Sequence, residues 1–157
     1  MTDTPEWHYF GSARVNSTEN RICFPDRLFE AGILSRDGKA YWAYEKVVGF
    51  LVVSNRELEQ KEEYKQQGNT NIGTSEDGYR ATIPKQFFSD TEKTGGPVEK
   101  KARVEYGETR HFVCRDRMME GDSQSCYLLR REQLESTIST PTEWKGSFDS
   151  IPRFLQE

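Results

Sequence analysis

The stretch NRICFPDRLFEAG, residues 20–32, has a counterpart 59 positions further along the chain, YRATIPKQFFSD, residues 79–90. Four pairs of identical or similar residues align at this offset: Arg21 with Arg80, Phe24 with Ile83, Pro25 with Pro84, and Phe29 with Phe88. An internal repeat constrains the fold more strongly than any single element, because each copy is expected to form the same structural unit. We therefore predict two copies of one unit within the chain.

The repeated motif predicts a short strand followed by a helical turn. In each copy an arginine precedes alternating apolar residues, over residues 21–24 and 80–83. The proline that follows ends the strand because it has no N–H group to donate. Pro25 suits the start of a helix, and Gly32 suits its end. Each copy is thus expected to pass from strand to helix at its proline.

Two further strands are predicted after each helical turn. Residues 39–44 and 47–53 are expected to form a hairpin in the first copy, and residues 98–106 and 109–115 a hairpin in the second. A second alignment, at an offset of 62 positions, supports this expectation because it matches aromatic residues of the two hairpins.

The segment between the copies is polar and begins with Ser54 and Glu57, which have the spacing of a capping box. The predicted organisation is a first copy over residues 11–55, a polar linker helix over 56–70, a second copy with an extra strand at 125–129 over 71–135, and a C-terminal tail over 136–157. We expect a mostly β protein with short helices. The two copies would be β-barrel half-units that pack on each other as an intrachain pseudo-dimer.

Composition narrows the class of protein. A chain of 157 residues with 34% hydrophobic and 12% aromatic residues is sufficient for one ordinary domain. The longest apolar run, residues 47–53, is far shorter than the roughly 20 residues of a membrane-spanning helix. The N-terminus has neither the basic region nor the apolar core of a secretory signal, so we expect a cytoplasmic protein. The three cysteines lack zinc-site spacing, and we predict reduced thiols, no metal and no cofactor.

The pattern R-x-x-[IF]-P, followed by a short helix and a hairpin, resembles the AbrB-like swapped-hairpin family, which includes transition-state regulators and MazE-type antitoxins. Its two occurrences, over residues 11–55 and 72–116, resemble the tandem arrangement of MraZ-like proteins. The resemblance implies a β-barrel made by interleaving two copies, and it implies binding to double-stranded DNA. It therefore predicts a non-enzymatic DNA-binding transcriptional regulator.

The resemblance places the family's strand arginine at Arg21 and Arg80. We predict that six residues contact nucleic acid, the first four in the repeated motif and the last two on strands beyond it: Arg21, Arg27, Arg80, Lys85, Arg110 and Arg115. Cations of this kind neutralise phosphates, and with a net charge of −4 the chain needs a local basic patch to do so. The alternative for each arginine is a structural ion pair with one of the abundant carboxylates.

A protein-interaction module on the same scaffold is the alternative function. Its partner-binding residues would be the aromatic side chains of the tail, Trp144, Phe148 and Phe154, because antitoxins of the resembled family bind their toxins. The sequence leaves open whether the chain also forms a homodimer. The two functions differ in what they require, since one depends on arginines in the copies and the other on the tail.

Catalytic function is not predicted. Asp90, followed by Glu99, Lys100 and Lys101, has the form D…ExK of a metal-dependent nuclease motif, but the Gly-Gly-Pro between the acidic residues indicates a loop where such a site needs a hairpin. His111 and Cys114 are three residues apart on a predicted strand, which directs their side chains to opposite faces. We therefore expect no catalytic residues.

Overall fold

The computed structural model describes residues 7–36, 38–45, 50–56, 64–75, 78–88, 103–115, 118 and 124–137. Its strands are β1 (Trp7–Arg14), β2 (Arg21–Phe24), β3 (Lys39–Glu45), β4 (Leu51–Ser54), β5 (Tyr64–Ser75), β6 (Gly78–Thr82), β7 (Thr109–Arg115) and β8 (Ser125–Leu129). Its helices are α1 (Asp26–Glu30), the short 3-10 helix η1 (Lys85–Phe87) and α2 (Arg131–Thr137). The prediction of a mostly β protein with short helices is confirmed.

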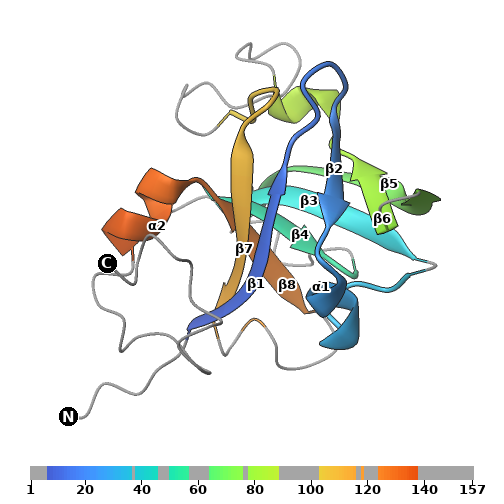
Figure 1. Ribbon diagram of the computed structural model, residues 1–157, viewed down its shortest axis with the longest axis horizontal. Helices are drawn as coiled ribbons and strands as arrows, with labels where there is room; N and C mark the ends of the chain where they lie inside the picture. The colour runs from blue at the N-terminus through green and yellow to red at the C-terminus, as the bar shows by residue number, and fades with distance from the viewer. Residues whose placement is uncertain are drawn as a thin grey trace.

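The strands form one antiparallel sheet in the order β1-β7-β8-β4-β3-β5-β6-β2. The two outer strands, β1 and β2, follow each other in the chain and lie side by side (Figure 1). At the turn between them the Asn16 N–H donates to the Arg21 carbonyl at 2.9 Å. The sheet is therefore a nearly closed barrel, as predicted, and pairs of strands from the two halves of the chain alternate around it.

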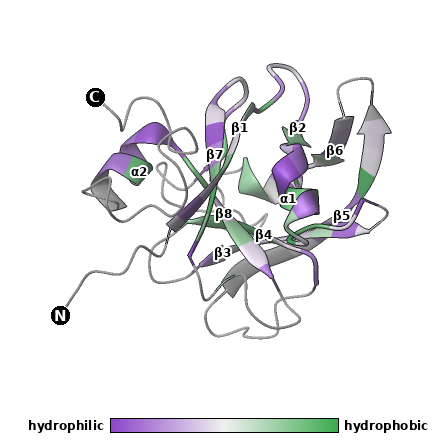
Figure 2. Cartoon of the chain, turned by 60° about the horizontal axis from the view of Figure 1, so that its bottom comes forward, coloured by the Kyte–Doolittle hydropathy of each residue, from purple (hydrophilic) through white to green (hydrophobic). Residues whose placement is uncertain are grey.

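Aromatic side chains fill the barrel around Phe24. Its ring centroid lies 6.0 Å from those of both Trp42 and Phe112 and 6.2 Å from that of Phe29. Figure 2 shows hydrophobic colour along part of β7 and hydrophilic colour on much of α2. Leu134 is the fully buried side chain that anchors α2 to the barrel. The apolar side chains thus gather inside the barrel, as expected for a closed sheet.

The predicted passage from strand to helix is confirmed at both prolines. β2 ends at Phe24 and α1 begins directly after Pro25, while β6 ends shortly before Pro84 and η1 follows it. Gly32 ends the first helical segment, as predicted, with a φ of +80° that favours glycine. The β3–β4 hairpin and β8 were also predicted correctly.

The prediction of a polar helix over residues 56–70 is wrong where the structure describes it. Residues 64–70 belong to β5, which pairs with β3 through its first half and with β6 through its second. The hydroxyl of Thr70 accepts a hydrogen bond from Trp42 Nε1 at 2.9 Å. A polar sequence with helical propensity has become a strand because it pairs with β3, and its continuation at residues 72–75 pairs with β6. Residues 57–63 lie outside the described part of the chain.

The predicted hairpin of the second copy is also wrong. Residues 103–106 are not a strand, and residues 98–102 lie outside the described part of the chain. β7 is present over Thr109–Arg115 as predicted, but it pairs with β1 and β8. The Val104 N–H donates to the Phe87 carbonyl, and the Arg103 carbonyl accepts hydrogen bonds from arginine side chains. These bonds hold the segment as a loop over one end of the barrel.

Candidate functional site

The outer surface of the β2–β6 pair carries two of the predicted arginines. Ile22 and Ala81 are buried and face each other across the pair. The residues on either side of them therefore point outward, because side chains alternate along a strand. The outward residues are paired as Arg21 with Thr82 and Cys23 with Arg80. We call these four side chains the arginine face.

The two cations of the arginine face lie on the diagonal of adjacent residue pairs, which places them within reach of one ligand. The Arg21 guanidinium forms an ion pair with Glu19, and 31% of the Arg21 side chain is exposed. Arg80 is half-buried and is paired in register with Gly73 of β5, where an added Cβ would meet nothing within 4 Å. Open space therefore lies beside Arg80.

Arg27 and Lys85 lie at opposite ends of the β2–β6 pair. Lys85 is exposed at the start of η1, which follows β6, and Arg27 is exposed on α1, which follows β2 (Figure 1). The Arg27 guanidinium lies 5.8 Å from the ring centroid of Phe10. Four of the six predicted residues are thus on or next to the arginine face.

Arg110 does not belong to this surface. It is 1% exposed and shares the inward side of β7 with Phe112. Its Nε donates to Glu108 at 2.5 Å, and its other nitrogens donate to the carbonyls of Leu128 at 2.8 Å and Arg103 at 3.2 Å. Glu108 also accepts a hydrogen bond from Arg130. Arg110 is therefore a buried structural cation, and the structure gives it no surface for a phosphate.

Arg115 is separate from the arginine face as well. It is half-buried at the end of β7, with its guanidinium 5.4 Å from the ring centroid of Trp7, its partner in register. The predicted partner-binding residues Trp144, Phe148 and Phe154 lie outside the described residues, as do Asp90, Glu99, Lys100 and Lys101.

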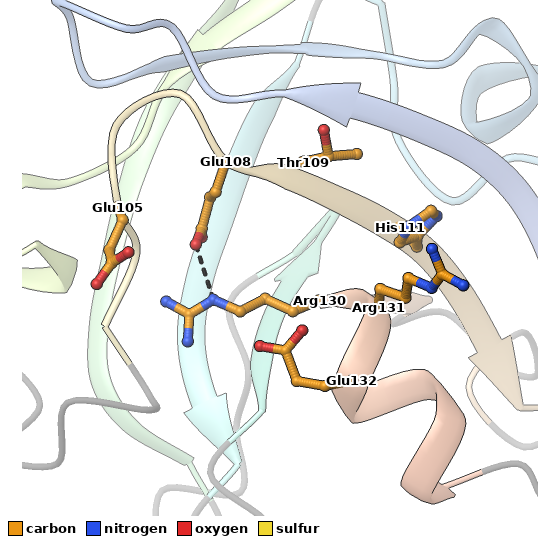
Figure 3. Close-up of a pocket in the computed structure, with 7 residues that line it drawn as sticks. All are labelled: Glu105, Glu108, Thr109, His111, Arg130, Arg131 and Glu132. Atoms are coloured by element: carbon orange, nitrogen blue, oxygen red, sulfur yellow. Dashed lines mark hydrogen bonds and ion pairs between the residues drawn. The ribbon is translucent and has the colours of Figure 1, made fainter.

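A pocket of about 520 Å³ lies where β7 meets the start of α2 (Figure 3). Charged and polar side chains line it: Glu105, Glu108, Thr109, His111, Arg130, Arg131 and Glu132. Sequence reasoning missed the pocket because its two groups of residues are about twenty positions apart. The pairing of β7 with β8 brings them together.

The pocket holds both signs of charge and one buried imidazole. The Glu108 carboxylate lies 2.7 Å from Arg130 Nε, and His111 Nδ1 lies 3.0 Å from the Tyr9 hydroxyl. Burial lowers the pKa of His111, and the positive charge of Arg131 lowers it further. Cys114 points inward from β7, so the pocket does not place it beside His111 as a catalytic pair.

Acidification is expected to destabilise the fold through His111. Its pKa is lower in the folded state than in the unfolded state, where it is about 6.5, so the unfolded state binds more protons as the pH falls through that value. Stability should therefore decrease between about pH 7.5 and 5.5. Urea unfolding at both pH values checks this. His111→Gln should lose less stability on acidification than the wild type, and an equal loss would contradict the assignment to His111.

Within the described residues no helix is long and apolar enough to span a membrane, and no group of three His, Cys, Asp or Glu side chains is arranged to hold a metal ion. The arginine face and the pocket are two places where the described part of the chain gathers charged side chains. Comparison of the chain with protein-family models, with curated proteins and with solved structures gave no match, so the assignment of function depends on the residues themselves.

Proposed function

We propose that this protein is a DNA-binding transcriptional regulator built from two swapped-hairpin copies in one chain. The observation that carries the proposal is the arginine face, where Arg21 and Arg80 point outward from neighbouring strands. Guanidinium groups are suited to phosphate because they donate two parallel hydrogen bonds and remain charged. Lys85 and Arg27 extend the basic surface at the two ends of the strand pair.

The register of the β2–β6 pair supports the two-copy part of the proposal. Arg21 faces Thr82, and Cys23 faces Arg80. At the repeat offset of 59, Thr82 is the counterpart of Cys23, and Arg80 is the counterpart of Arg21. Arg21 therefore faces the counterpart of Cys23, and the counterpart of Arg21 faces Cys23 itself. This reciprocal contact is what a two-fold axis between two like strands produces.

The strand order supports the same interpretation. Exchanging the first four strands for the last four, β1 for β5 through β4 for β8, leaves the cyclic order around the barrel unchanged. In each half the second strand is followed by a proline and a helical turn. A barrel with this order interleaves the two halves, because β1 pairs with β7 and β5 pairs with β3.

Binding by the arginine face would depend on exchange of ligands at Arg21. The exposed ion pair with Glu19 contributes little stability, so a phosphate can take the place of the carboxylate. Arg80 would then contact the same or the adjacent phosphate. Each neutralised phosphate releases counterions, which makes the affinity fall steeply as salt rises.

Arg80→Gln is expected to weaken binding to duplex DNA by about tenfold and to lower the slope of log affinity against log salt by about 1, because one phosphate contact is lost. Fluorescence anisotropy with a random duplex pool between 50 and 200 mM salt measures both quantities. The loss should not depend on sequence if Arg80 contacts the backbone only.

Two variants serve as controls for this experiment. Arg131→Gln removes an exposed arginine of α2 that pairs with Glu135, and it should leave affinity unchanged. Glu19→Gln removes the carboxylate that competes for Arg21, and it should increase affinity. An Arg131 variant that weakens binding as much as the Arg80 variant, or wild-type protein that binds no DNA at 50 mM salt, would reject the proposal.

A further inference from the structure

Two aromatic rings are stacked at the end of the barrel next to η1. The ring centroids of Phe88 and Tyr106 are 4.7 Å apart, and the ring planes meet at 21°. Phe88 is half-buried. Tyr106 is 51% exposed, and among the described residues it is the large hydrophobic side chain classed as exposed. One ring is thus fixed beneath another that faces solvent.

The backbone beneath these rings is held by hydrogen bonds from three segments. The Val15 N–H donates to the Glu108 carbonyl at 2.7 Å, and the Gly107 N–H donates to the Val15 carbonyl at 3.0 Å. The Val104 N–H donates to the Phe87 carbonyl at 2.9 Å. The residues on both sides of Tyr106 are therefore fixed, which lowers the conformational entropy lost when a ligand stacks on the ring.

Positive side chains flank the stacked rings. Arg14 is exposed, and its Nε donates to the Gly107 carbonyl at 2.8 Å. Gly107 directly follows Tyr106 in the chain. Lys85 is exposed three residues before Phe88, and side chains three apart in a 3-10 turn lie on the same side. Glu105, by contrast, lines the pocket at the base of α2 (Figure 3). An aromatic surface with flanking cations results.

We infer that Tyr106 and Phe88 form a platform on which an unpaired base of single-stranded DNA stacks, with Arg14 and Lys85 placed to contact the flanking phosphates. Stacking on an aromatic ring accepts any base, and cations beside the ring follow the backbone. The inference rests on the proposed function in assigning nucleic acid as the ligand, but it uses a different part of the surface. Lys85 is the one residue that the two sites share.

The test compares a fluorescein-labelled dT12 oligonucleotide with a duplex of the same length. Tyr106→Ala is expected to weaken binding to dT12 by about tenfold, the usual effect of losing one stacked base, and to leave duplex binding within about twofold. Tyr106→Phe keeps the ring and should bind dT12 like the wild type. A dT12 variant with a central 2-aminopurine should lose fluorescence on binding, and this quenching should be absent with Tyr106→Ala.

The outcomes separate the platform from the arginine face. Wild-type protein that binds the duplex but not dT12, or Tyr106→Ala that binds and quenches like the wild type, overturns the platform and leaves the proposed function standing. A third outcome is that dT12 binding requires Tyr106 while duplex affinity is unchanged by Arg80→Gln. This outcome overturns the proposed function and supports the platform. Protein that binds neither oligonucleotide rejects both.

Discussion

Replacing Glu108 by glutamine is expected to lower the free energy of unfolding by about 3–5 kcal/mol, the range measured when one partner of a buried ion pair is removed. Glu108 accepts hydrogen bonds from the side chains of both Arg110 and Arg130. Arg110 is only 1% exposed, so the loss of the carboxylate leaves a buried charge held by the carbonyls of Arg103 and Leu128.

Urea unfolding followed by tryptophan fluorescence measures this effect. Glu105→Gln is the matched control, since it makes the same change at an exposed position of the same loop and should alter stability by less than about 0.5 kcal/mol. Adding Arg110→Met to the Glu108 variant removes the uncompensated charge and should recover much of the loss. A Glu108 variant as stable as the Glu105 variant would show that the ion pair is not needed for folding.

The elements predicted from sequence are those with local signals. An arginine, an alternating apolar stretch and a proline were sufficient to locate β2 and α1, because proline ends a strand and suits the start of a helix. The positive φ of Gly32 follows from the same local reasoning. Such signals are complete within a few residues, so no tertiary contact is needed to interpret them.

The elements that sequence reasoning missed depend on distant partners. Residues 64–70 have the polar composition of a surface helix, yet they complete the barrel between β3 and β6. Residues 65–71 contain no large apolar side chain, so they offer no alternating apolar pattern to separate a strand from a polar helix. Its identity is decided by strands that lie far away in the chain.

The candidate site shows the same division. Arg21 and Arg80 were both predicted to contact nucleic acid, and the register of their strands places them on one surface. Arg110 was predicted as a surface cation, although its position two residues before Phe112 was a signal that it faces inward. An arginine is rarely fully buried unless it has a carboxylate partner. The partner here is Glu108, two residues before Arg110, and nothing in the sequence around Glu108 marks it for that role.

Phe24→Ala is expected to lower the free energy of unfolding by about 3–5 kcal/mol, the usual cost of removing a buried phenylalanine ring. The Phe24 ring is 4% exposed and contacts three other aromatic rings, stacking on Trp42 at 26° and meeting Phe112 at 71°. These neighbours come from β3 and β7, so the cavity left by alanine lies between strands of both halves of the chain. Phe24→Leu fills part of that cavity and should cost less.

The same substitution also tests the two-copy interpretation. Ile83 occupies the counterpart position in the second motif and is fully buried, so Ile83→Ala should cost about 2–5 kcal/mol. Tyr106→Ala removes an exposed ring and should change stability by less than about 0.5 kcal/mol, which provides the aromatic control. Urea midpoints and slopes measure all three. If Ile83→Ala proved as harmless as Tyr106→Ala while Phe24→Ala unfolded the protein, the two motifs would not hold equivalent places in the core. Comparable losses at Phe24 and Ile83 are expected if two like units share one barrel. In that arrangement the residue before each proline is buried in the core at an equivalent place.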